Sequence, residues 1–268
     1  MNWALNKNIN LINTFYTQRV NDNLYEPLLQ EIEVTFLNAA GEELKRNNES
    51  PCKLQALHSS AALVINIFQY WKKIGKIDSI AKIINSTCNE NNLQMSFEKE
   101  FIINQSFPIP PTLDIIFISK SYNNVIAVES KFSEPYYGSH TGLKEKYFTN
   151  QEVNKLWRDI PSIKKIAEEI CPKDRKFTYL HVAQLIKHIM GLKRYYKKED
   201  FVLLYLWYDV PSLDGYLHQK EIEFITELFR KDGINFKSMT YQELIIQLAE
   251  KFRKDHYNYI KYITERYL

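Results

Sequence analysis

Residues 110–136 read PPTLDIIFISKSYNNVIAVESKFSEPY, and this stretch contains two strongly apolar runs joined by a short polar segment. The runs 112–119 and 124–132 are rich in Ile, Val and Phe, which favour strands. Ser121–Asn124 is polar, typical of a turn, and short enough for an antiparallel hairpin. The sequence therefore predicts two adjacent strands, and both are expected to be central because neither run shows polar alternation.

Charged residues interrupt both runs near their ends, where a buried strand tolerates them least. Asp114 lies near the start of the first run, and Glu129 and Lys131 lie near the end of the second. Side chains alternate between the two faces of a strand, so Glu129 and Lys131 project to the same side. Hairpin pairing brings Asp114 to the same end of the sheet, and we expect the three groups to converge there.

Two carboxylates and an ammonium group at one place have a chemical and a structural interpretation. Carboxylate oxygens suit Mg²⁺, which takes one or two carboxylates, several waters and phosphate oxygens of a substrate. Such an ion activates a bound water and offsets charge on a phosphorus-centred transition state, and Lys131 is suited to orient or deprotonate that water. In the structural interpretation, Asp114 caps a turn and Glu129 and Lys131 lie on an exposed edge strand, which the missing polar alternation disfavours.

The flanking sequence predicts an α/β fold with a central mixed β-sheet flanked by α-helices. Apolar residues at helical spacing predict helices on both sides of the hairpin, and further apolar runs predict strands. The core order is helix, strand, strand, strand, long helix and strand, and a hairpin among these strands excludes an all-parallel sheet. The predicted helices are an N-terminal helix, 53–75, 79–91, 150–160, 162–170, 179–198, 217–233 and one or two terminal helices. The other predicted strands are 31–38, 96–104, 200–210 and 235–241.

Four segments together resemble a known nuclease superfamily. Asp114 after the prolines, then the hairpin and Glu129-x-Lys131, resemble the signature of the PD-(D/E)xK superfamily, which has the restriction-endonuclease-like fold. The segments LHSSAALVINIFQY, PTLDIIF, AVESKFSEPY and QLIKHIMGL, in this order, are similar to a group of bacterial proteins described as restriction endonucleases. The resemblance covers the core at 53–210, and it implies that Asp114 and Glu129 bind metal and that Lys131 is the catalytic lysine. In the signature, the proline directly precedes the aspartate, whereas here two residues separate Pro111 from Asp114. The proline of this signature is often missing, so the departure matters little.

Weaker candidates surround these three residues. Gln184 on the long helix is similar in position to a glutamine that related nucleases carry beside the active site. His58 begins the first core helix and is either a further metal ligand or a surface or helix-cap residue. Glu134 either supports the catalytic lysine or a second metal ion, or it begins a turn. Glu98 and Glu100 project to one face of the preceding strand, so one of them can approach the site, although exposure to solvent is the simpler expectation.

Positive charge is concentrated in one part of the chain. Residues 143–200 contain fourteen Lys and Arg against eight Asp and Glu, whereas the whole chain has a net charge of +3. A basic segment in a nearly neutral protein fits either a polyanionic partner or a solvated helix face. In a nuclease it predicts contacts with the phosphates of duplex DNA, chiefly from a basic helical insertion at 138–176. The candidates for these contacts are Lys144, Lys146, Arg158, Arg175 and Lys176.

The composition argues against several classes of protein. Cys52, Cys88 and Cys171 are far apart and fit neither a disulfide framework nor a zinc site. The N-terminal segment lacks the apolar core of a signal peptide, and no apolar run has transmembrane length. We therefore expect a soluble cytoplasmic protein without membrane association.

These observations predict one nuclease domain spanning residues 1–268, which includes the basic insertion and a helical C-terminal extension at 211–268. The predicted activity is Mg²⁺-dependent endonucleolytic hydrolysis of duplex DNA in restriction-modification, with Mn²⁺ as a substitute. The alternatives are a DNA repair or mobile-element nuclease of the same fold, a catalytically inactive DNA-binding or assembly protein, and a structural cluster of ion pairs. A homodimer would fit, since restriction-type relatives commonly dimerise to cut both strands, and the aromatic segment 256–268 suits either an interface or packed core.

Overall fold

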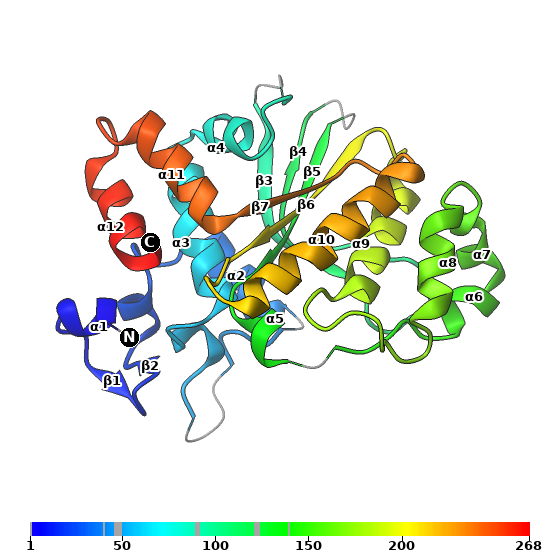
Figure 1. The fold of residues 1–268 in the computed structure, drawn as a ribbon. Coiled ribbons are helices and arrows are strands. Elements are labelled where there is room, and N and C mark those ends of the chain that lie inside the picture. Colours follow the sequence, from blue (N-terminus) through cyan, green and yellow to red (C-terminus); the bar gives the residue numbers. More distant parts are fainter. Residues whose placement is uncertain (1, 40, 46–49, 89–91, 121–123, 139) are drawn as a thin grey trace.

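The central element of the computed structural model is a five-stranded sheet in the order β3-β4-β5-β6-β7 (Figure 1). Neighbouring strands are antiparallel from β3 to β5 and parallel from β5 to β7, so the predicted mixed α/β sheet is confirmed. The structure describes residues 2–39, 41–45, 50–88, 92–120, 124–138 and 140–268. The strands are β3 (Gln94–Glu100), β4 (Thr112–Ile118), β5 (Val125–Lys131), β6 (Phe201–Trp207) and β7 (Phe236–Thr240).

β4 and β5 pair as the predicted antiparallel hairpin. Their ladder ends with Ile115 opposite Val128, and the predicted turn includes residues 121–123, which lie outside the described residues. On its other edge β5 pairs in parallel with β6, and Glu129 lies opposite Tyr205. β5 therefore has a hydrogen-bonded neighbour on each edge, as its apolar sequence predicts.

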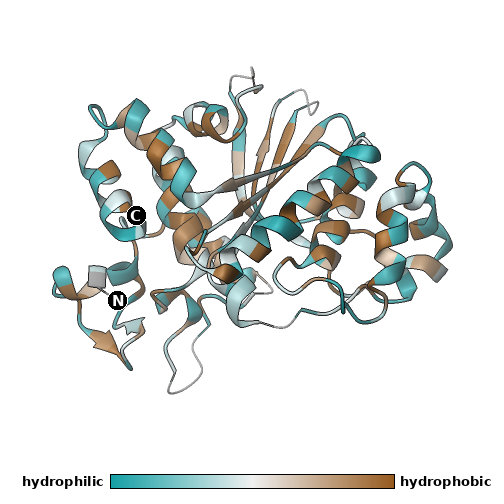
Figure 2. Ribbon diagram, in the orientation of Figure 1, coloured by the Kyte–Doolittle hydropathy of each residue, from teal (hydrophilic) through white to brown (hydrophobic). Residues whose placement is uncertain are grey.

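Helices cover both faces of this sheet and divide the core in two. Ile126 and Val128 of β5 belong to the core on one face, whereas Val125 and Ala127 belong to the core on the other. Figure 2 shows apolar residues concentrated on the central strands and in stripes along the flanking helices. One face is covered by α2 (Gln30–Asn38), α3 (Ser60–Lys73), α4 (Ile77–Ile84), α11 (Tyr241–Phe252) and α12 (Tyr257–Tyr267), and the other by α8 (Pro161–Glu169), α9 (Val182–Tyr195) and α10 (Leu213–Lys231) (Figure 1).

The long connection between β5 and β6 contains the basic insertion and then α9. Parallel neighbours require such a crossover, and α9 packs back onto the sheet to complete it. Within the insertion, the Trp157 indole N–H donates a 2.9 Å hydrogen bond to the carbonyl oxygen of Tyr147, which ties its short helices together. The shorter elements of the chain are α1 (Asn2–Asn6), β1 (Leu11–Ile12), β2 (Tyr16–Thr17), α5 (Glu134–Tyr137), α6 (Lys146–Thr149), α7 (Gln151–Asn154) and the 3₁₀ turns Val20–Asn23, Lys53–Gln55 and Lys155–Trp157.

The prediction of a strand at 31–38 is wrong, because this segment forms α2. Ile32, Val34 and Phe36 alternate with polar residues and resemble a strand pattern. Ile32 and Phe36, four residues apart, are buried, whereas Val34 remains 51% exposed. The i, i+4 spacing therefore decided the local structure, and packing of one helical face overrode the strand propensity of the branched residues.

Two further expectations from composition can be compared with the structure. Cys52, Cys88 and Cys171 are free thiols in the structure. Within the described residues, no helix is both long enough and apolar enough to span a membrane.

Candidate active site

Glu129 is the most deeply buried charged residue near the predicted site. It lies at the end of β5, is 1% exposed, and projects towards α9. Its Oε1 is 2.5 Å from the Lys131 Nζ, and its Oε2 is 2.8 Å from the His188 Nε2. Burial alone would raise the pKa of Glu129, but Lys131 and His188 outweigh that effect and lower the pKa to about 2. Glu129 is therefore held as a carboxylate inside the protein.

The two oxygens of this carboxylate are held differently. Lys131 donates a hydrogen bond to Oε1, whereas His188 Nε2 lies at ion-pair distance from Oε2 without a well-aligned hydrogen bond. Each oxygen therefore has a neighbour that favours the charged form of Glu129.

Asp114 lies beside Glu129 on the neighbouring strand. The β4–β5 ladder ends with Ile115 opposite Val128, and Asp114 and Glu129 are the residues next to this last pair. The Ser130 N–H donates a 2.7 Å hydrogen bond to Asp114 Oδ2, which fixes the carboxyl group at this edge. Burial and the Glu129 carboxylate both raise the pKa of Asp114 well above its ordinary value. The two carboxyl groups therefore repel each other in the absence of a cation.

Lys131 is the third of the predicted residues, and it projects to the same face as Glu129. Burial alone would lower the pKa of Lys131, but the carboxylates of Glu129, Asp114 and Glu134 outweigh burial and raise it. The ammonium group therefore keeps its proton at neutral pH. The structure brings together the three residues that the strand pattern predicts.

Lys131 also lines a small hollow of about 150 Å³ beside the carboxylates. Gln184 lines the same hollow from α9, one turn before His188, so the structure brings this predicted residue beside Lys131. Glu134, at the start of α5, lines it too and accepts a 2.8 Å hydrogen bond from the Phe132 N–H. The other lining residues are Pro135, Gly138, His140, Tyr179, His181 and Tyr205.

The two glutamates of β3 differ in their environments. Glu98 is partly buried, and burial together with the carboxylates of Glu129 and Glu43 raises the pKa of Glu98 to about 7. Glu100, two residues further along the strand, is exposed. The expectation of solvent exposure therefore holds for Glu100, and Glu98 lies close enough to the site to interact with its charges.

His58 lies in a different setting from the other candidates. It is exposed before α3, and its ring packs edge-on against Phe15 and Tyr16 at centroid distances of 6.3 and 6.4 Å. Ser59, rather than His58, caps the helix by accepting a hydrogen bond from the Ala62 N–H. Among the contacts of the described residues, none joins His58 to Asp114 or Glu129.

The predicted phosphate-binding residues separate into two groups. Lys144 is exposed and Lys146 partly so, and both lie near Lys187 of α9, whose pKa is lowered by burial and by these neighbouring cations. The Glu129 carboxylate raises the pKa of Lys187 against these effects, so Lys187 lies within electrostatic range of the site. In the second group, Arg158 and Arg175 are exposed on the insertion, and Lys176 is paired with Glu169 at 2.5 Å.

Sequence reasoning missed the roles of His188 and Ser130. His188 follows Gln184 by four residues and therefore lies on the same face of α9, which was the available signal. Ser130 lies between Glu129 and Lys131. Its N–H binds Asp114, and its hydroxyl lies 2.6 Å from the Tyr241 hydroxyl on the opposite face of the sheet.

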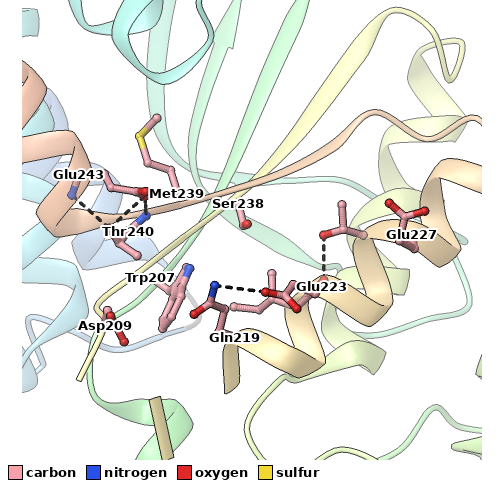
Figure 3. Close-up of a pocket in the computed structure, with 11 residues that line it drawn as sticks. Trp207, Asp209, Gln219, Glu223, Glu227, Ser238, Met239, Thr240 and Glu243 are labelled. Carbon is pink, nitrogen blue, oxygen red and sulfur yellow. Dashed lines mark hydrogen bonds between the residues drawn. The ribbon is translucent and has the colours of Figure 1, made fainter. Parts of the chain in front are cut away.

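A larger hollow of about 530 Å³ lies further along the same edge of the sheet, beyond Trp207 (Figure 3). Its lining comes from β6, β7, α10 and α11 and includes the carboxylates of Asp209, Glu223, Glu227 and Glu243. A concentration of carboxylates repels the phosphates of a nucleic acid. The smaller hollow at Lys131 is therefore the better candidate for an anionic substrate.

The residues present fit a hard divalent cation with open coordination positions. Among the described residues, no group of three or more His, Cys, Asp and Glu side chains is placed to hold a metal ion. Asp114 and Glu129 offer a pair of carboxylates, which leaves the other coordination positions to water and substrate. This donor set suits Mg²⁺ or Mn²⁺, which retain waters and share phosphate oxygens, better than zinc.

Comparison with known proteins gave one match. A family model described as "Restriction Endonuclease associating with ARP" matches residues 5–268, nearly the whole chain. Searches of curated proteins and of solved structures found no match.

Proposed function

The chain belongs to the family of restriction endonucleases associating with ARP, and from this we propose that it is a metal-dependent endodeoxyribonuclease acting on duplex DNA. The supporting observation is the buried Glu129 carboxylate, which lies beside Asp114 and Lys131 where the two central strands β4 and β5 meet. The residues match the PD-(D/E)xK pattern in order and in their position at the end of the central strands.

Asp114 and Glu129 would hold Mg²⁺, with Mn²⁺ as a substitute. When bound, such an ion lowers the pKa of a coordinated water and offsets negative charge at the reacting phosphorus. Asp114 is fixed by the Ser130 N–H, and Glu129 is fixed by Lys131 and approached by His188, so both carboxylates are positioned before substrate arrives.

Lys131 acts as a cation in this proposal rather than as the base. Its raised pKa keeps the ammonium protonated, so it can donate hydrogen bonds to a phosphate oxygen or to the attacking water. Glu134 stabilises that charge, and the Gln184 amide lines the hollow in which the phosphate would lie. Lys144, Lys146 and Lys187 would bind the backbone phosphates of the duplex.

The test is digestion of plasmid DNA of known sequence by the purified protein with Mg²⁺, followed by mapping of the ends. We expect discrete fragments, which identify a restriction-type activity. Cleavage confined to branched or single-stranded DNA would instead indicate a repair or mobile-element nuclease. Binding without any cleavage, with either Mg²⁺ or Mn²⁺, would indicate an inactive DNA-binding protein and would contradict the proposal.

Glu129→Gln should abolish cleavage, because the neutral amide cannot replace the carboxylate as a metal ligand while its volume remains the same. Glu100→Gln is the matched control, since Glu100 is an exposed glutamate on the same sheet. The loss should be seen in the rate of plasmid cleavage, with the circular dichroism spectra of both variants unchanged. Wild-type cleavage by Glu129→Gln would exclude this site as the active site.

A further inference from the structure

Two histidines from different parts of the chain line the hollow at Lys131. His140 lies in the connection that follows α5, and His181 directly precedes α9. Their ring centroids are 5.1 Å apart, and the ring planes are inclined by 30°. The hollow therefore brings a pair of imidazoles to the place where the phosphate of a substrate would lie.

Asp174 fixes the position of His140. Its Oδ1 accepts hydrogen bonds from the Lys176 N–H at 2.9 Å and the Phe177 N–H at 3.1 Å, and its Oδ2 lies 3.2 Å from His140 Nε2. Burial alone would raise the pKa of Asp174, but His140 and the two N–H groups outweigh burial and lower it. Asp174 is therefore a carboxylate, and one of its oxygens faces the imidazole.

Gly142 allows the two segments that carry His140 and Asp174 to approach each other. A Cβ at Gly142 would lie 1.9 Å from the carbonyl oxygen of Ile170 and 2.7 Å from the backbone nitrogen of Asp174. Any other residue would force these segments apart, because its side chain has no space there. The close packing is a second observation, independent of the ion pair, that the chain holds this imidazole beside this carboxylate.

The carboxylate also selects a form of the His140 ring. Because a carboxylate only accepts hydrogen bonds, it favours the tautomer with the proton on Nε2, which leaves Nδ1 as the proton acceptor. The side chain is only 12% exposed, so bulk water has little access to it. Burial and His140 lower the pKa of His181 to about 4, so this second ring is neutral and does not repel a positive charge on the first.

We infer that His140 is the catalytic base of the hydrolysis and that Asp174 is a positioning residue that holds its ring. This inference rests on the proposed function. Lys131 cannot take the proton of the attacking water, because its ammonium group keeps its own proton at neutral pH. The His140 imidazole lines the same hollow and has a nitrogen that accepts a proton.

The proton transfer accompanies the displacement at phosphorus. The oxygen of the attacking water bonds to phosphorus while one proton of that water passes to His140 Nδ1. The bond from phosphorus to the leaving oxygen breaks, its electron pair stays on that oxygen, and the oxygen takes a proton from solvent. The Asp174 carboxylate stabilises the imidazolium, which afterwards returns its proton to solvent.

Three variants test this assignment. His140→Ala removes the base and leaves a space beside the hollow that free imidazole can enter. Asp174→Asn keeps the side-chain volume but can present an amide N–H to Nε2, which favours the tautomer that cannot accept a proton at Nδ1. The matched control is His256→Ala, since the His256 ring packs against Trp71 in the core on the other face of the sheet.

The experiment measures kcat for plasmid cleavage with Mg²⁺, with and without imidazole in solution, and the melting temperature of each protein. We expect His140→Ala and Asp174→Asn each to lower kcat by about 10²–10⁴-fold, the usual effect of losing a general base. Their double variant should lose no more than either alone, because the two residues act as one unit. Imidazole should restore part of the rate of His140→Ala and leave wild type, His256→Ala and Glu129→Gln unchanged.

The affinity for DNA separates catalysis from substrate binding. His140→Ala and Asp174→Asn should bind DNA as tightly as the parent protein when fluorescence anisotropy is measured in the Glu129→Gln background. A base acts on the attacking water and adds nothing to binding of the ground state, so kcat should fall while KM stays the same.

Each way in which the inference fails differs from failure of the proposed function. A wild-type rate in His140→Ala, with Glu129→Gln inactive, would exclude His140 as the base and leave the nuclease proposal intact. A lower rate that imidazole does not restore would assign His140 and Asp174 a structural role. An absence of cleavage by the wild-type protein itself would overturn the proposed function, and the inference with it.

Discussion

His188 contacts the Glu129 carboxylate from α9, opposite the contact made by Lys131. It is 2% exposed, and its Nε2 lies 2.8 Å from Glu129 Oε2. A group that orients a metal ligand without touching the substrate affects both metal affinity and rate, typically by 10–100-fold. His188 is therefore a positioning residue in the proposed mechanism.

We expect His188→Leu to lower kcat for DNA cleavage by about 10–100-fold while KM for DNA stays the same. The reason is that Glu129 loses one of the two groups that fix its orientation. His188→Gln retains an N–H donor and should recover part of the rate. Steady-state kinetics of the three proteins would show this pattern, whereas equal kcat values would mean that Lys131 alone positions Glu129.

The three main site residues were predictable because strand alternation depends on only two neighbouring elements. Glu129 and Lys131 share a face in any strand, and the hairpin fixes Asp114 beside them. The left-handed backbone of Glu98 was not predictable, because a single positive φ leaves no trace in the amino-acid pattern. His188 required knowing how α9 is rotated against the sheet, which depends on long-range packing.

At the scale of elements, His218 connects α10 to α5 and β6. Its ring is buried, with Nε2 3.1 Å from the Tyr205 hydroxyl and Nδ1 3.2 Å from the Tyr136 hydroxyl. Trp207 packs against the same ring at a centroid distance of 4.7 Å. Burial lowers the pKa of His218 to about 4, so the ring is neutral in the folded protein at physiological pH.

Acid should therefore destabilise this packing. The histidine is protonated near pH 6.5 in the unfolded chain but only near pH 4 in the folded protein. The contribution of His218 to the free energy of unfolding is therefore complete above pH 6.5 and is lost as pH falls from 6.5 to 4. We expect a loss of about 2 kcal/mol between pH 7.5 and pH 5 from this one group. Chemical denaturation of wild type and His218→Gln at the two pH values would measure it.

The pH dependence should be smaller in His218→Gln, which cannot take up this proton. His58→Gln is the control for removing a histidine elsewhere, because His58 is exposed and packs against Phe15 and Tyr16 rather than against His218. His181 also has a pKa lowered to about 4 by burial and by His140, so part of the dependence should persist in His218→Gln. An unchanged pH dependence in His218→Gln would contradict the assignment.

The elements of the core were predictable to different degrees. β5 and β6 are buried along almost their whole length, and their continuous apolar sequences leave few alternatives. α2 lies at the periphery of the core, where a short segment can satisfy either a strand or a helix pattern until packing selects one. The wrong prediction at 31–38 arose there, outside the elements that form the site.

At the scale of the whole molecule, charge distinguishes the two hollows at the edge of the sheet. Carboxylates line the hollow beyond Trp207, whereas Lys144, Lys146 and Lys187 lie near the hollow at Lys131. The contrast favours approach of a duplex from the side of α9. Electrostatic binding of this kind weakens steeply with salt because counterions are released from the DNA.

The double variant Lys144→Gln, Lys187→Gln should bind DNA more weakly and with a lower salt dependence. Each phosphate contact contributes about one unit to the slope of log affinity against log salt, so the slope should fall by about two. Fluorescence anisotropy in the Glu129→Gln background, where cleavage is absent, would measure it. Lys251→Gln, Lys254→Gln is the control, because α11 and the segment after it lie on the other face of the sheet.

An unchanged slope in Lys144→Gln, Lys187→Gln would mean that DNA binds elsewhere. The remaining candidates, Arg158, Arg175 and Lys176, lie on the insertion and would be examined next. A fall in slope for the control pair would indicate a binding path across the opposite face.

The position of Asp114 and Glu129 on adjacent strands has a consequence for how the site can change. Backbone hydrogen bonds keep neighbouring strands about 4.8 Å apart, and packed cores on both faces oppose any movement of a strand. The distance between the two strands that carry the carboxyl groups is thus set by the main chain. A side-chain substitution does not change this distance. Exchanging Asp for Glu at these positions shifts an oxygen by one methylene length against a fixed frame, so a change that preserves charge does not preserve geometry.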